Sequence, residues 1–135
     1  MSNLISLEEI SQRLSNYPAF VIVADTLDKW QTPATAEGKT MLHNHYLWLL
    51  DLEKQGKLVL AGPMNHDVIA KGLMPAIGST TGLIMIKAET REDAEVIAVQ
   101  DPFHVSGYRK NVVHSLNIRF GVDKDVLNKS TNWPV

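Results

Sequence analysis

Residues 42–63, which read LHNHYLWLLDLEKQGKLVLAGP, decide the fold because a helix pattern runs directly into a strand pattern. One apolar stripe recurs there at helical spacing and consists of Leu42, His45, Leu49 and Leu52. The pattern predicts a helix over residues 33–56, with a proline in its first turn and a glycine at its end. The apolar run of residues 57–61 predicts a strand, which a Gly-Pro pair ends.

Further helices and strands are expected on both sides of this segment. The expected helices cover residues 6–17 and 90–101, and the expected strands cover residues 20–24, 82–89 and 112–120. Ser6 and Thr90 each begin a capping box, in which a hydroxyl accepts from the first helical turn while an acidic side chain reaches back. We read residues 20–24, an unbroken apolar run, as a strand buried on both faces. Residues 64–81 are expected to form a long loop.

The order strand, helix, strand, strand, helix, strand is that of a ferredoxin-like α+β domain, here with an additional helix in front. We expect three parts: an N-terminal helical extension over residues 1–18, the ferredoxin-like domain over residues 19–121 and a polar C-terminal tail over residues 122–135.

The expected strands carry apolar side chains on both faces, although two crossover helices cover only one face of a four-stranded sheet. In residues 82–89, for example, Leu83 and Met85 point one way while Ile84 and Ile86 point the other. An exposed apolar face favours burial against a second copy. The pattern therefore predicts a homodimer that packs sheet against sheet, and the N-terminal helix is a rival cover for part of that face.

Composition narrows the classes of function. The chain has 135 residues, a formal net charge of −2 and no cysteine, which excludes disulfides, thiolate metal sites and cysteine nucleophiles. The absence of a basic run disfavours nucleic-acid binding. No stretch has the length and apolarity of a membrane span, and no signal peptide is visible, so a cytoplasmic protein is expected.

Two polar residues stand out against their expected surroundings. His45 lies on the apolar stripe of its helix, where a buried imidazole needs a hydrogen-bond partner. Asp101 lies at the expected end of a helix, where the macrodipole disfavours a negative charge. Each has a simpler explanation, a satisfied core histidine in one case and an ordinary Asp-Pro turn in the other. His43 and His45 point to different sides of the helix, which argues against a shared metal ion.

The motifs resemble those of the YCII-related domain. The resemblance rests on residues 45–63, from a helical histidine to an AGP strand end, on the acidic helix start at residues 89–94 and on DPF at residues 101–103 followed by Gly107. It implies a ferredoxin-like fold that dimerises through its sheets, a dimeric α+β barrel. It also implies that His45 and Asp101 form an enzymatic pair.

Three features depart from the family pattern. The helix over residues 6–17 is additional. The third strand begins with Gly82, where relatives often carry a serine or threonine near the proposed pocket. The last strand ends in Ile118-Arg119-Phe120 and lacks the common Pro-aromatic pair.

The sequence thus suggests an isomerase or lyase that acts on a small lactone, enol or hydroxylated ring, needs no cofactor and uses His45 and Asp101 as a general acid/base pair. The expected substrate-binding residues are Gly62, Pro63, Thr81, Gly82, Phe103, His104, Tyr108 and His114. The alternative is a non-catalytic dimeric module that binds a small ligand or a protein. A haem-using barrel with His114 as ligand is a third, weaker hypothesis.

Overall fold

The computed structural model describes residues 4–69 and 75–121. Four strands in this part of the chain form one antiparallel sheet in the order β2-β3-β1-β4. The strands are β1 Tyr17–Thr26, β2 Leu58–Pro63, β3 Thr80–Ile86 and β4 Arg109–Ile118. This order, with a helix between β1 and β2 and another between β3 and β4, is the ferredoxin-like arrangement. The predicted fold class is therefore confirmed.

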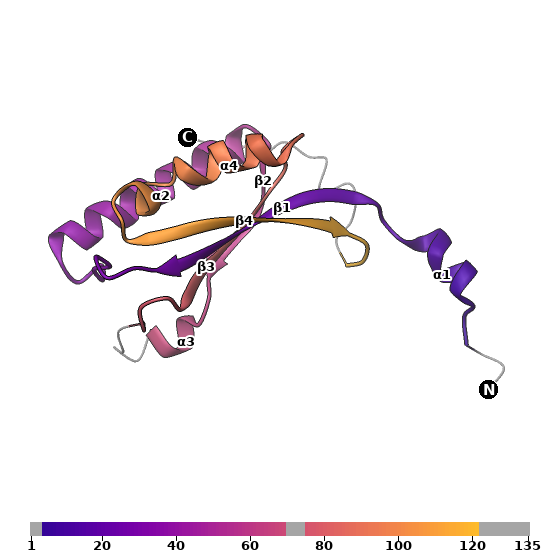
Figure 1. Ribbon diagram of the computed structural model, residues 1–135, viewed down its shortest axis with the longest axis horizontal. Helices are drawn as coiled ribbons and strands as arrows, with labels where there is room; N and C mark the ends of the chain where they lie inside the picture. The colour runs from indigo at the N-terminus through magenta and orange to yellow at the C-terminus, as the bar shows by residue number, and fades with distance from the viewer. Residues whose placement is uncertain (1–3, 70–74, 122–135) are drawn as a thin grey trace.

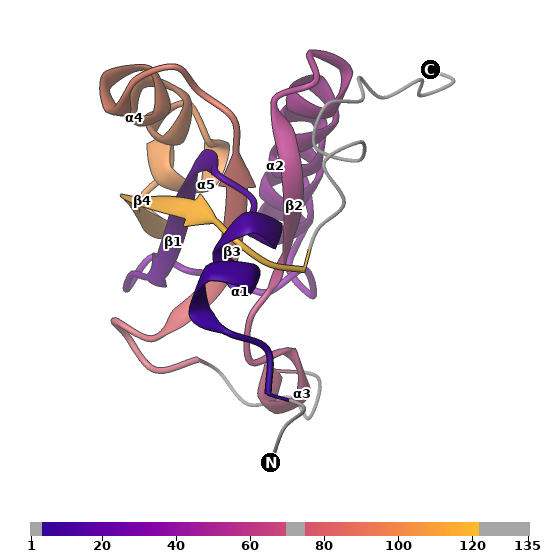
Figure 2. The same ribbon diagram turned by 90° about the vertical axis from the view of Figure 1, so that its right-hand side faces the viewer.

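The helices are α1 Leu7–Arg13, α2 Ala36–Lys54, α3 His66–Ile69, α4 Arg91–Val99 and α5 Pro102–Val105. The two long helices, α2 and α4, lie on the same face of the sheet (Figure 1). The short helix α5 lies between them (Figure 2), and this position brings the α4–α5 junction close to α2. None of the helices described here has the length and apolarity needed to cross a membrane.

Both predicted helix caps are present. The Ser6 hydroxyl accepts the Glu9 backbone N–H at 3.2 Å, and the Thr90 hydroxyl accepts the Asp93 N–H at 3.1 Å. The first helix is shorter than predicted, because α1 ends at Arg13 and the chain from Tyr17 onward belongs to β1.

The core fills the space between the sheet and its helices. It consists of Phe20, Ile22, Ile84 and Ile86 from the strands and Leu52, Ala94 and Ala98 from the helices. Within one chain the first strand is buried on its inner face only, and the predicted burial of both faces depends on a second copy. Val21 and Val23 are only half-buried, because they point to the face that no helix covers.

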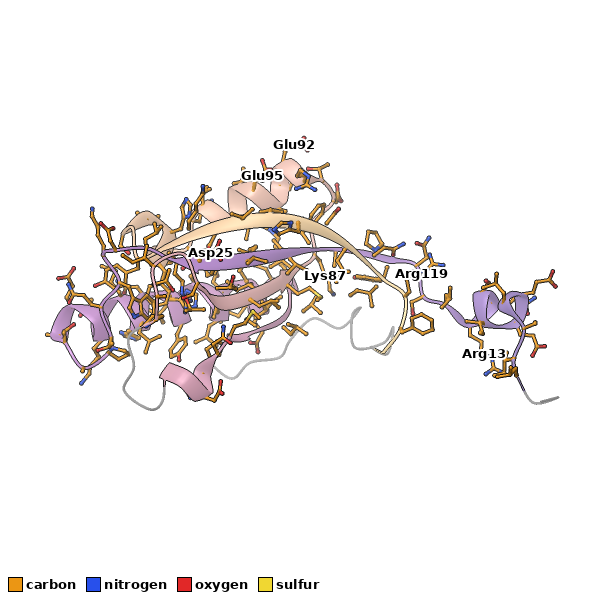
Figure 3. The ribbon with its side chains drawn as sticks, turned by 60° about the horizontal axis from the view of Figure 1, so that its bottom comes forward. Arg13, Asp25, Lys87, Glu92, Glu95 and Arg119 are labelled. Atoms are coloured by element: carbon orange, nitrogen blue, oxygen red, sulfur yellow. The ribbon has the colours of Figure 1, made fainter. Side chains whose placement is uncertain are left out.

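The uncovered face of the sheet is apolar. Met85 pairs with Val21 and with Leu60 across the strands, and Leu60 and Leu116 are 44% and 40% exposed. The rival cover predicted for this face, the N-terminal helix, does not lie on it. Helix α1 buries no residue, and Figures 1 and 3 show it beyond the end of the sheet, with Arg13 far from Asp25.

The C-terminal half differs from prediction in two places. Asp101-Pro102 does not simply end a helix, since Asp101 caps the N-terminus of α5. The last strand begins at Arg109 instead of residue 112, directly after a turn in which Gly107 has a φ of 80°. The predicted tail over residues 122–135 lies outside the described residues, as do residues 70–74 of the predicted loop.

Candidate active site

His45 and Asp101 are in direct contact although 56 residues separate them in the chain. The His45 Nδ1 lies 2.7 Å from the Asp101 Oδ1. His45 comes from the inward stripe of α2 and is 6% exposed, whereas Asp101, between α4 and α5, is completely buried. The structure thus brings together the two residues that the sequence hypothesis requires, and places His43 outside the core.

Asp101 is held by two further contacts. Its Oδ1 also accepts the Phe103 backbone N–H at 3.0 Å, and its Oδ2 accepts the Asn111 side-chain amide at 3.0 Å. The Phe103 contact is an N-cap interaction, in which a carboxylate satisfies a free N–H at a helix start. The expectation of an unfavourable helix C-terminal charge is therefore wrong, since the carboxylate caps the helix that follows.

These contacts set the charge of Asp101. Complete burial opposes ionisation, but the hydrogen bond and charge of His45, together with Asn111 and the Phe103 N–H, hold the pKa of Asp101 below the usual aspartate value. The carboxylate is therefore ionised at neutral pH and must accept its hydrogen bond from His45. It follows that Nδ1 of His45 carries a proton.

The other ring nitrogen of His45 is free to act on a ligand. In the described part of the chain Nε2 has no hydrogen-bond partner, and it is not among the buried unpaired atoms. His45 lines a cavity of about 350 Å³, so Nε2 opens on that space. The imidazole is stacked on the Phe103 ring at 4.4 Å between ring centres, which fixes the plane of the imidazole.

The cavity lies between α2 and the ends of β2 and β3. Its walls are mainly apolar, and they include Trp30, Leu42, Leu49, Ala61, Ile84 and Phe103. Of the expected substrate-binding residues, four line it, namely Gly62, Pro63, Gly82 and Phe103. A cavity of this volume is at the small end of ligand sites and fits a single ring.

The other four expected residues lie elsewhere. Thr81 is buried behind the wall, where its hydroxyl contacts Thr26 at 2.9 Å. Tyr108 packs behind Phe103, with the two rings stacked. The His104 Nδ1 accepts the Asn111 backbone N–H at 3.1 Å. His114 is exposed on the uncovered face of the sheet, opposite Val21, because β4 alternates and His114 is out of phase with the inward residues.

Arg109 was not singled out from the sequence, yet it is the most unusual residue of the cavity. It is 6% exposed, and its guanidinium lies 4.9 Å from the Trp30 ring centre and 4.8 Å from that of Phe103. Its Nε donates to the Thr81 hydroxyl at 3.1 Å, and its Nη2 donates to the Thr81 carbonyl at 3.0 Å. Thr81 therefore contributes by holding Arg109.

Burial is unfavourable for the Arg109 charge. It lowers the pKa of Arg109 to about 10, although the charges of Asp101 and Tyr46 act in the opposite direction. The guanidinium stays protonated at neutral pH. A shift of this size corresponds to roughly 3 kcal/mol of destabilisation of the folded state.

Replacing Arg109 with methionine is therefore expected to stabilise the protein. The change removes a buried charge and leaves no acceptor unpaired, since Thr81 still contacts Thr26 and its carbonyl still accepts the Met64 N–H. Thermal unfolding followed by circular dichroism should show a midpoint raised by several degrees. A midpoint lowered by several degrees would mean that Arg109 is a structural residue.

One signal in the sequence could have identified Arg109. Arg109, Asn111 and Val113 alternate with Lys110 and Val112, and the first set points toward the helices once the strand begins at residue 109. Because the predicted strand began at residue 112, this alternation was not applied to Arg109. Asn111, which holds Asp101, was missed for the same reason.

Comparisons with known proteins identify the family of the chain. The profile of the YCII-related domain matches residues 19–115, a range that contains both His45 and Asp101. Among solved structures, the chain is similar to the 5-chloro-2-hydroxyhydroquinone dehydrochlorinase from Burkholderia phenoliruptrix AC1100 in complex with 2,5-dihydroxybenzoquinone. The identity is 18%, the TM-score is 0.45, and the match covers 71% of this chain and 90% of that chain. No curated protein matches the chain.

Proposed function

Because the chain belongs to the YCII-related domain family, we propose that it is an enzyme that moves a proton on a small organic substrate. His45 is the general base and Asp101 orients it. The observation that carries the proposal is the 2.7 Å contact between the two residues, together with the free Nε2 that opens on the cavity. A histidine that only packs in a core normally has both ring nitrogens hydrogen-bonded within the protein.

The proposed step is a proton transfer from carbon to nitrogen. The Nε2 lone pair takes a proton from the substrate, and the electron pair of the broken C–H bond moves into the substrate. Asp101 remains ionised and stabilises the imidazolium that forms, as a buried carboxylate does beside a catalytic histidine. The imidazolium then returns the proton at another position, which completes an isomerisation, or protonates a departing group, which completes an elimination.

Covalent catalysis is not part of the proposal. The chain has no cysteine, and in the described residues the only hydrogen-bond partner of His45 is Asp101. An activated serine or threonine would lie within hydrogen-bond distance of the base. The two residues thus support acid/base chemistry on a lactone, an enol or a hydroxylated ring.

The test is exchange of substrate hydrogen with solvent. The protein is incubated in D₂O with panels of small lactones, enols and hydroxylated rings, and proton NMR follows deuterium incorporation, isomer formation or loss of a leaving group. The proposal predicts turnover of at least one compound class by the wild type. Binding of such compounds without exchange or conversion would instead support the non-catalytic ligand-binding module.

We also propose that two copies associate through the uncovered face of the sheet, which carries Leu60, Met85 and Leu116. Leu116→Asp places a charge in that interface, while the side chain is already 40% exposed in one chain, so the fold should tolerate it. Sedimentation equilibrium should show a dimer for the wild type and a monomer for this variant. Leu47→Asp is the matched control, because Leu47 is 51% exposed on α2 and should leave the dimer intact. A monomeric wild type would contradict the proposal.

A further inference from the structure

We propose that Arg109 is the anion-binding residue of the cavity, so that the ligand is a small planar organic anion with a carboxylate or an ionised ring hydroxyl. The inference gives a substrate class to the proposed function and rests on it for the ligand's role as a substrate. Anion binding itself does not require His45 to be catalytic.

Arg109 makes no ion-pair contact in the described part of the chain, although the charge of Asp101 acts on it from beyond contact distance. The His45–Asp101 contact is the ion pair found there, and Asp101 is already occupied by His45, Asn111 and Phe103. The guanidinium is more than nine-tenths buried and lies in the cavity wall. A buried cation without a carboxylate in contact is unfavourable for folding. An anion bound in the cavity would compensate this charge.

The hydrogen bonds of Arg109 leave one edge of the guanidinium unused. Nε and Nη2 both donate to Thr81, which occupies the edge that these two nitrogens form. Nη1 has no partner in the described residues and is not among the buried unpaired atoms, so it opens on the cavity. The remaining edge, formed by Nη1 and the second hydrogen of Nη2, matches the geometry of a carboxylate.

Gly82 makes the room for this edge. A Cβ atom at position 82 would lie 2.9 Å from Nη1 and 3.2 Å from the central carbon of the guanidinium. Gly82 also lines the cavity. The missing side chain at Gly82 therefore lets the guanidinium reach the cavity.

The surroundings of Arg109 point to a planar ligand. Trp30 and Phe103 hold the guanidinium between aromatic contacts, and Phe103 also stacks on His45. Arg109 and His45 thus both contact the Phe103 ring, and both line the same cavity of about 350 Å³ with mainly apolar walls. An anionic oxygen on Arg109 would place the body of a single-ring ligand among those walls, beside the base.

The test measures binding of two anions and one neutral analogue. Benzoate presents a carboxylate, 4-nitrophenolate presents an ionised hydroxyl, and benzamide has the shape of benzoate without its charge. Calorimetry and the ¹⁵N resonance of the Arg109 Nε–H report affinity and contact. The wild type should bind at least one anion more tightly than benzamide, and Arg109→Met should weaken that binding by about 10- to 100-fold. The anion that binds more tightly shows whether Arg109 prefers a carboxylate or an ionised ring hydroxyl.

Control variants separate this inference from the proposed function and from misfolding. His45→Asn should bind the anion within about threefold of wild type, whatever its turnover. Arg91→Met, at an exposed arginine on α4, should leave affinity unchanged. Gly82→Ala should shift the Arg109 signals, whereas Gly62→Ala, with nothing within 4 Å of its added carbon, should not. The proposal would be overturned if wild type and Arg109→Met bound the anion equally well. It would also be overturned if the wild type bound no anion, or bound none more tightly than benzamide.

Discussion

Replacing His45 with alanine is expected to lower kcat/KM for proton transfer by about 10²- to 10⁴-fold, the range typical of a positioned general base. The substitution removes the nitrogen that opens on the cavity and leaves Arg109 and the apolar walls in place. The loss should therefore fall on kcat, with little change in ligand affinity. Single-turnover kinetics on a compound identified by solvent exchange measure this directly.

Two further variants distinguish loss of the base from loss of the folded structure. Removing His45 leaves a buried carboxylate with fewer partners, which destabilises the fold. His45→Asn keeps an amide N–H that can donate to Asp101 while still removing the base, so it should fold and remain inactive. His43→Ala, on the exposed side of the same helix, should retain full activity. Full activity in a folded His45→Asn protein would eliminate the mechanism.

The second large effect is expected for Asp101→Asn, which should lower kcat by about 10²- to 10⁴-fold without moving the ring of His45 far. An asparagine amide turned to donate to Nδ1 would force the proton onto Nε2, which is the nitrogen that must accept one. In that orientation the amide oxygen takes the place of Oδ2 and still accepts from Asn111, while the Phe103 N–H loses its acceptor. Activity close to wild type would show that the carboxylate does not select the tautomer.

The same variant should change how stability depends on pH. The pKa of Asp101 is lowered in the folded state, so its contribution to the free energy of unfolding is fully present above the unfolded value near 3.9 and is lost as the pH falls through the folded pKa. Chemical denaturation should show wild type more stable than Asp101→Asn by about 2 kcal/mol at pH 7, and the difference should shrink as the pH falls below about 3.9. A difference that does not vary with pH would contradict an ionised Asp101.

The fold could be predicted from local patterns because the local sequence signals and the observed elements agree. The apolar stripe of α2, the cap at Thr90 and the Gly-Pro end of β2 each specify one element without tertiary information. The element order then allows few arrangements of the sheet. Short elements were missed, since the four residues of α5 and of α3 show no helical period.

The site could be predicted only in part. His45 is marked by its place on an apolar stripe, and Asp101 by its proline and by the family pattern. The positions of Arg109 and Asn111 depend on where β4 begins, which the turn at Gly107 sets and local periodicity does not reveal. The strand alternation puts His114 and Leu116 on one face of the sheet, but which face this is depends on the register with β1.

The proton on the His45 ring tests the central claim most directly. Long-range ¹H–¹⁵N spectra of histidine-labelled protein distinguish the two ring nitrogens of the neutral imidazole. The contact with an ionised Asp101 predicts that Nδ1 carries the proton and that the Nε2 resonance shifts when a ligand enters the cavity. A proton on Nε2, or an Nε2 signal that no cavity ligand moves, would show that His45 is not a base aimed at a substrate.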